Sequence, residues 1–200
     1  MPEKPDLAAL LGSRICHDLI SPLGAIGNGV ELLMMAGGQS GPEISLIAES
    51  VMNANARIRY FRIAFGASGN GLDQRISRSE VATILDDMTC GSRLQIEWQS
   101  PPDLSRREVK LALLLILCLE TAMPYGGRIE VERSETRWAI TGTATKLKLD
   151  TALWNLLADP GILPEIGPQH VHFLLALEEI MRQHRRLLTT LTDSEIRFSF

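Results

Sequence analysis

Apolar residues recur at every third or fourth position through the first third of the chain. The first series runs through Ala8, Leu11, Ile15, Leu19, Leu23, Ile26, Val30 and Leu33. A second series, after the glycine-rich segment 36–42, runs through Ile44, Ile47, Val51, Ala54, Ile58, Phe61 and Phe65. This spacing predicts two long helices that form a hairpin. Two helices with one apolar stripe each do not bury both stripes, so the pattern favours a homodimer built around a four-helix bundle.

The periodicity changes after segment 67–71, whose composition is typical of a linker. Helical patterns follow at 78–89, 104–123, 150–158 and 168–183, and alternating patterns typical of strands follow at 93–99, 128–133, 137–142 and in a C-terminal hairpin. We therefore expect an α+β fold with two domains. Residues 1–70 form the dimerising helical hairpin, and residues 75–200 form helices packed on one sheet.

Composition narrows the classes of function. The chain has 200 residues, 45% of them hydrophobic, and a formal net charge of −4. That charge gives no electrostatic reason to bind nucleic acid. The three cysteines are widely spaced, and no apolar run approaches the ~20 residues that span a bilayer. We therefore expect a cytoplasmic protein with no membrane segment. We also expect no metal site, because His170 and His172 lie two apart on a predicted helix and so point to different faces.

One histidine on the first predicted helix stands out. At ~100° per residue, His17 points away from the apolar stripe. It shares its face with Leu10, Ser13, Ser21, Gly24 and Asn28, most of which are small or polar. Pro22 follows five residues later and removes the helical hydrogen bond to the carbonyl of Asp18. An exposed histidine is often an ordinary surface residue, so the geometry alone leaves its role open.

The chemistry of the histidine suits a phosphoryl acceptor. A neutral imidazole offers one ring nitrogen as a nucleophile at physiological pH. A carboxylate that accepts a hydrogen bond from the other ring N–H fixes the tautomer and stabilises the cation that forms. Asp18 is the candidate for that role.

The segment His17-Asp18-Leu19-Ile20-Ser21-Pro22-Leu23-Gly24-Ala25-Ile26 resembles the H-box of sensor histidine kinases. The shared features are the histidine, the acid after it and the proline five residues on. The resemblance implies that His17 carries phosphate.

The second half resembles the ATP-binding domain of those kinases in the order of its elements, without the motif residues. Segment 111–132 is similar to the helix, turn and strand around the asparagine box, but positions 117–120 read Leu, Cys, Leu and Glu. Segment 140–146 has no carboxylate to read adenine, and no glycine-rich lid precedes the last helix. Without oxygen ligands for Mg²⁺ or loops around phosphates, we expect no nucleotide cofactor in this chain.

Together these features resemble the ChpT-type histidine phosphotransferases of alphaproteobacteria, over nearly the whole chain. The resemblance implies a degenerate kinase-like ATPase α/β sandwich after the dimeric hairpin. It also implies a phosphorelay in which phosphate comes from a receiver domain, such as that of an upstream hybrid kinase, and passes to response-regulator receiver domains. Mg²⁺ would then belong to the receiver. Two alternatives stay open: an ATP-dependent histidine kinase with divergent boxes, and a non-catalytic scaffold or antikinase.

The hairpin geometry predicts where a partner docks. If the turn lies near residues 38–39, residue i faces about residue 77 − i, so we expect His17 to lie across from Tyr60. The expected docking surface comprises Ser21, Gly24, Asn28, Glu49, Met52 and Asn53. The cations expected near the phosphate are Arg57, Arg59 and Arg62. Asp86 and Asp87 are expected on a solvated helix face.

Overall fold

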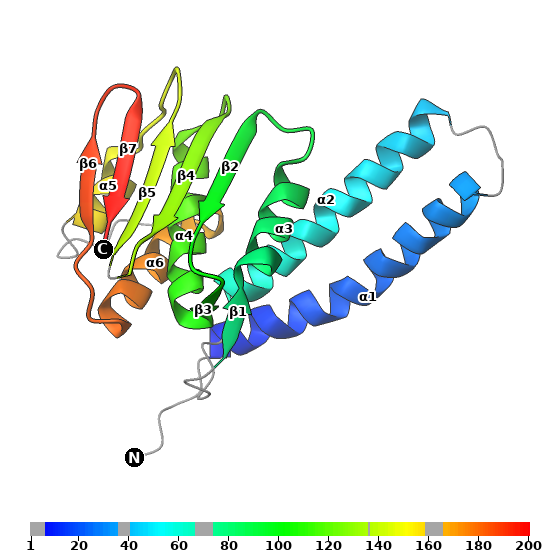
Figure 1. Ribbon diagram of the computed structural model, residues 1–200, viewed down its shortest axis with the longest axis horizontal. Coiled ribbons are helices and arrows are strands. Elements are labelled where there is room, and N and C mark those ends of the chain that lie inside the picture. Colours follow the sequence, from blue (N-terminus) through cyan, green and yellow to red (C-terminus); the bar gives the residue numbers. More distant parts are fainter. Residues whose placement is uncertain (1–6, 36–40, 67–73, 136, 159–165) are drawn as a thin grey trace, which may run out of the picture. The chain divides into compact units, whose positions relative to one another are not determined.

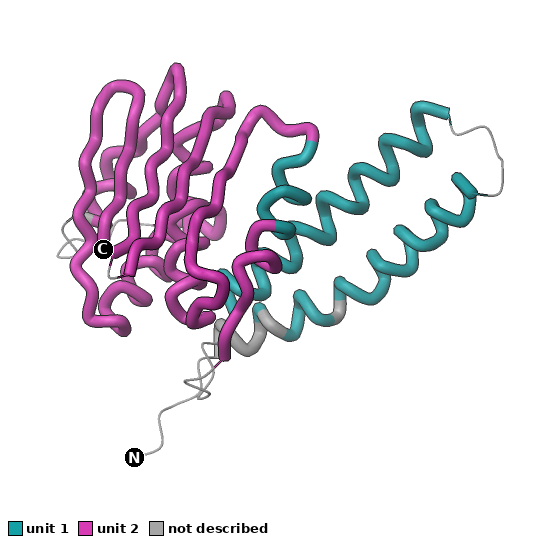
Figure 2. The backbone as a smooth tube through the Cα atoms, viewed as in Figure 1, with its two compact units in different colours: residues 1–72, 83–90 teal, residues 73–82, 91–200 magenta. Residues whose placement is uncertain are grey.

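A computed structural model describes residues 7–35, 41–66, 74–135, 137–158 and 166–200. The chain divides into two compact units (Figure 2). Unit 1 comprises residues 1–72 and 83–90, and unit 2 comprises residues 73–82 and 91–200. Segment 83–90 thus groups with the first unit, although the sequence assigned it to the second domain.

Unit 1 is built on two long helices that lie side by side, α1 (Leu7–Met35) and α2 (Pro42–Ala64) (Figure 1). The second begins with a proline after Gly41, a position where the missing N–H costs nothing. Contacts at two glycines fix how the helices pair. A β-carbon on Gly12 would lie 3.7 Å from Cβ of Phe65, and one on Gly27 would lie 3.4 Å from Cγ1 of Val51. Both contacts fit, to within one residue, the predicted pairing of residue i with residue 77 − i.

The hairpin buries only part of its apolar surface. Cys16 and Val30 of α1 are buried, as are residues of α2 that include Val51 and Tyr60. Four members of the predicted stripe on α1 are about half exposed or more: Ile15 (50%), Leu19 (45%), Ile26 (51%) and Leu33 (60%). Much of the stripe therefore stays exposed in a single hairpin, although Val30, which belongs to it, is buried.

The core of unit 2 is a five-stranded sheet in the order β2-β4-β5-β7-β6. Its strands are β2 (Leu94–Gln99), β4 (Gly127–Arg133), β5 (Trp138–Thr143), β6 (Leu188–Leu191) and β7 (Glu195–Ser199). The β2–β4 pair is parallel, and the other pairs are antiparallel. Figure 1 shows the helices α4 (Arg106–Ala122), α5 (Thr151–Ala158) and α6 (Val171–Arg182) against one face of this sheet. The expected mixed α+β fold is confirmed, and the predicted helices and strands of this half occur within a few residues of their expected positions.

Two short strands and one helix start differ from the sequence prediction. Strand β1 (Arg75–Ser77) pairs antiparallel with β3 (Asp103–Ser105), and the side chains of Arg75 and Asp103 form an ion pair. Residues 104–105 therefore belong to a strand, and α4 begins at Arg106 rather than 104. Three residues are too few to show an alternating pattern. Helix α3 (Arg78–Thr89) follows β1 directly and has the bounds that the sequence predicted.

The turn between α4 and β4 depends on its two glycines. Gly126 and Gly127 have φ angles of 91° and 148°, a backbone conformation that residues with a side chain rarely adopt. A β-carbon at Gly126 would also overlap the carbonyl oxygen of Arg93. These residues let the chain leave the apolar helix and enter the parallel strand pair at once.

Candidate functional site

His17 lies on α1 with its side chain exposed. Ser21 and Asn28 on the same face are exposed as well, and Gly24 is half-buried. A β-carbon on Gly24 would have no atom within 4 Å outside its own helix backbone. Among the described residues, the face below the histidine is thus open around Ser21, Gly24 and Asn28.

The helix runs unbroken through Pro22, five residues beyond the histidine. Proline has no N–H, so the carbonyl of residue 18 lacks its helical hydrogen bond at this point. The predicted role of Asp18 stays a prediction, because the side chain of Asp18 lies outside the described residues.

On α2, the predicted docking residues differ in their exposure to solvent. Glu49 is exposed, and Met52 is 58% exposed. Asn53 is half-buried and donates its amide N–H to the carbonyl of Met88 at 3.0 Å. This bond satisfies a free carbonyl at the C-terminal end of α3. Asn53 therefore anchors α3 on α2, a role that the sequence did not suggest.

The arginines predicted to lie near the phosphate differ in their contacts and in their exposure. Arg59 forms an ion pair with Asp87 of α3 at 2.7 Å, with both side chains about 40% exposed. Asp87 is thus not merely solvated as predicted, because it pairs with a cation across two helices. Arg62 is exposed in the last turn of α2. Burial raises the pKa of the Cys16 thiol, and the nearby charge of Arg62 opposes that rise.

The direction of each side chain follows from the two glycine contacts. Val51 and Phe65 mark the side of α2 that faces α1. At ~100° per residue, Arg62 projects about 40° from that line toward the side of the hairpin that carries His17. By the same count, Arg57 projects about 100° toward the other side and Tyr60 points away from α1. Tyr60 is completely buried, so it shares the level of His17 without facing it.

In unit 2, helix α4, where the sequence resemblance places the position of an asparagine box, is part of the core. Residues 111–119 of α4 are all buried, and positions 117–119 are Leu, Cys and Leu. Burial raises the pKa of the Cys118 thiol well above its usual value. This stretch of α4 offers no polar group to a nucleotide.

The next turn of α4 contacts α6 through a neutral histidine. Thr121 donates its hydroxyl to the carbonyl of Leu117 at 2.9 Å, and its oxygen lies 3.1 Å from Nε2 of His172. Burial, with a smaller contribution from His170, lowers the pKa of His172 to about 4. The ring is therefore neutral near pH 7 and donates its Nε2–H to Thr121. We find no group of three metal-binding side chains among the described residues.

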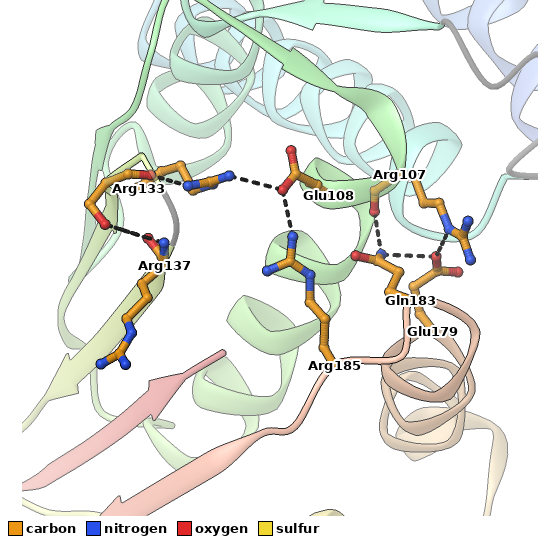
Figure 3. Close-up of polar contacts among 8 residues, drawn as sticks. Arg107, Glu108, Arg133, Arg137, Glu179, Gln183 and Arg185 are labelled. Atoms are coloured by element: carbon orange, nitrogen blue, oxygen red, sulfur yellow. Dashed lines mark hydrogen bonds and ion pairs between the residues drawn. The ribbon is translucent and has the colours of Figure 1, made fainter.

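A polar network joins the start of α4 to the end of α6 (Figure 3). Glu179 is 1% exposed and contacts Arg107 at 3.3 Å and Lys110 at 3.9 Å. Gln183 donates to the same carboxylate at 3.0 Å. The buried Glu179 carboxylate thus has partners inside the unit, and the network stabilises the packing of α4 against α6.

No described helix is both long and apolar enough to cross a bilayer. The chain has clear relatives among known proteins. A family model for the histidine phosphotransferase C-terminal domain matches residues 78–195. The protein phosphotransferase ChpT of Brucella abortus (strain 2308) is 38% identical over 165 residues, which cover 80% of this chain and 77% of that protein.

Solved structures add a match over the full length. A bacterial phosphotransferase with 30% identity superposes with a TM-score of 0.69, over 100% of this chain and 97% of that one. The histidine kinase domain of a blue-light activated kinase from Erythrobacter litoralis EL346 covers 90% of this chain at 10% identity and a TM-score of 0.49. That second likeness is too low to carry an argument.

Proposed function

Because this chain belongs to the histidine phosphotransferase family, we propose that it accepts a phosphoryl group on His17 from one response-regulator receiver domain and passes it to another. The observation that carries the proposal is the exposed His17 above a face that includes Ser21, Gly24 and Asn28. A receiver must bring its aspartyl phosphate within ~3 Å of the ring nitrogen, so it needs an open surface around the histidine.

The transfer is a balanced exchange of one bond for another. The lone pair of a ring nitrogen forms a bond to phosphorus, and the bond from phosphorus to the receiver's aspartate oxygen breaks. The carboxylate leaves with that electron pair, and the ring becomes cationic while it keeps the proton on its other nitrogen. Transfer to the next receiver runs the same steps in reverse. Mg²⁺ in the receiver would neutralise the phosphoryl oxygens in both directions.

The working unit in this proposal is a homodimer. The half-exposed stripe of Ile15, Leu19, Ile26 and Leu33 lies on the side of α1 opposite His17. A second hairpin that covers this stripe would complete a four-helix bundle and leave both histidines accessible.

The proposal includes no nucleotide. In the kinases that this chain resembles, an asparagine on the helix equivalent to α4 binds magnesium and phosphates. Here that part of α4 lies in the apolar core, with Leu117 and Leu119 where an oxygen ligand would be needed. Phosphate must then come from another protein.

The test is phosphotransfer by His17 variants. His17→Gln and His17→Ala should lose transfer completely, while the free energy of unfolding changes by less than ~0.5 kcal/mol because the side chain is exposed. The assay uses a receiver domain phosphorylated in advance and freed of its kinase and of ATP. Transfer at the wild-type rate by either variant would reject the assignment.

A further inference from the structure

A phosphoryl group on His17 would place about two negative charges on an exposed helix face. A cation on the same side of the hairpin, close to the level of the histidine, would stabilise such a group. This inference rests on the proposed function and asks which side chain provides that cation.

The level is set by the paired glycines. The contacts of Gly12 with Phe65 and of Gly27 with Val51 place Arg62 opposite residues 15–16, less than one helical turn from His17. The direction agrees, since Arg62 projects from the line between the helices toward the side that carries His17. The guanidinium charge also acts on the thiol of Cys16, the residue next to the histidine.

The other two arginines of α2 fit less well. Arg59 projects toward the same side, but its guanidinium pairs with Asp87 at 2.7 Å. Arg57 projects toward the opposite side of the hairpin and is half-buried. Arg62 is exposed, so its long side chain can reach a new anion at the surface.

We propose that Arg62 binds the phosphoryl group on His17 and so sets how much phosphate the histidine holds in equilibrium with its receivers. A guanidinium donates two parallel N–H bonds to phosphate oxygens, and such bonds are stronger than those between neutral groups. Because the pair is exposed, its effect is moderate and falls with added salt.

The experiment compares Arg62→Gln with Arg62→Lys and with Arg57→Gln, which removes the same charge from the opposite side of the same helix. Each variant is mixed with a phosphorylated receiver, and the label on the two proteins is measured at equilibrium. We expect Arg62→Gln to shift the distribution toward the receiver about fivefold, Arg62→Lys to restore most of the loss, and Arg57→Gln to stay within twofold of wild type.

A second readout excludes a merely structural effect. The ³¹P resonance of the phosphohistidine should move in Arg62→Gln and stay in place in Arg57→Gln, with circular dichroism unchanged in both. An unchanged distribution and resonance in Arg62→Gln would overturn the role of Arg62 while label on His17 still upheld the proposed function. Absence of label from wild-type His17 would instead overturn the proposed function itself.

Discussion

The side chains near His17 fall into two groups, those that hold unit 1 together and those that face solvent. Asn53 and Arg59 belong to the first group, because each contacts α3. Ser21, Asn28 and Met52 belong to the second. A partner surface built from the second group would leave the contacts within unit 1 intact.

Gly24 gives the sharpest test of that surface. Glycine is unfavourable by ~1 kcal/mol in a helix interior, and a β-carbon here meets nothing outside its own helix backbone. Gly24→Leu should therefore keep or raise the free energy of unfolding and reduce the transfer rate at least tenfold by obstructing the receiver. Stopped transfer assays and chemical denaturation measure the two effects.

Gly29 offers a matched control, because its β-carbon position is also open and the residue lies about 120° from His17 around the helix. Because Gly29 lies one turn from Ile26 and Leu33 of the stripe, sedimentation must first show that Gly29→Leu is still dimeric, and the dimer should then transfer at the wild-type rate. A Gly24→Leu variant as fast as Gly29→Leu would place the receiver elsewhere.

Helical periodicity predicts which residues share a face with His17, because that face depends only on local spacing. The same periodicity could not predict the pair between Arg59 and Asp87, which are 28 positions apart. That contact depends on where α3 packs, and the spacing of apolar residues along a helix does not show which other helix it packs against. The adjacent acids Asp86 and Asp87 were visible in the sequence, but nothing local separated the paired one from the solvated one.

Among the elements, α1 carries the exposed stripe on which the proposed dimer depends. Ile26 is 51% exposed in the single chain. An aspartate there is tolerated by an isolated hairpin but would be buried and unpaired in a bundle. Ile26→Asp should shift the protein from dimer to monomer while its helical circular dichroism persists. Sedimentation velocity at micromolar concentration measures the shift, and a dimer unchanged by the substitution would mean that the stripe lies outside the interface.

The buried carboxylate of Glu179 on α6 contacts Lys110 on α4, and this contact leads to a second prediction. Glu179→Ala leaves Lys110, itself 4% exposed, without its carboxylate and should cost about 3–5 kcal/mol of unfolding free energy. The neighbouring Glu178 pairs with Arg182 at the surface, so Glu178→Ala should cost less than ~1 kcal/mol. Urea denaturation of both variants measures the difference, and equal costs would contradict the structural role of the buried pair.

The longer elements were predictable because each has enough residues to show a pattern: β7 alternates, and α4 is a long apolar run that is buried on all sides. The β1–β3 pair escaped prediction because each strand has three residues, and the pair closes over a sequence separation of nearly thirty. Its stability comes from that pairing and from the burial of Ile76 and Leu104 rather than from local preference, because the exposed Arg75–Asp103 ion pair contributes little.

At the scale of the molecule, the two units differ in which of the features tied to function they contain. Unit 1 holds the exposed histidine, whereas the family model matches residues 78–195, most of which form unit 2. Unit 2 holds the core helix α4, in which Leu117, Cys118 and Leu119 are buried.

This difference predicts that the protein does not bind ATP. Titration with ATP up to millimolar concentration, with and without Mg²⁺, should give no saturable heat by calorimetry, because Leu117 and Leu119 provide no ligand for the metal. A known histidine kinase domain serves as the positive control. A micromolar dissociation constant would favour an ATP-dependent kinase with divergent motifs.

The most direct test of the whole account is to follow one phosphoryl group without any nucleotide. A receiver domain is phosphorylated, separated from its kinase and from ATP, and mixed with the protein, and the modified residue is mapped by mass spectrometry under neutral conditions. The account predicts that label leaves the receiver, appears on His17 as an acid-labile and alkali-stable phosphate, and passes to a second receiver added afterwards. Label that stays on the first receiver, or that maps to a residue other than His17, would contradict it.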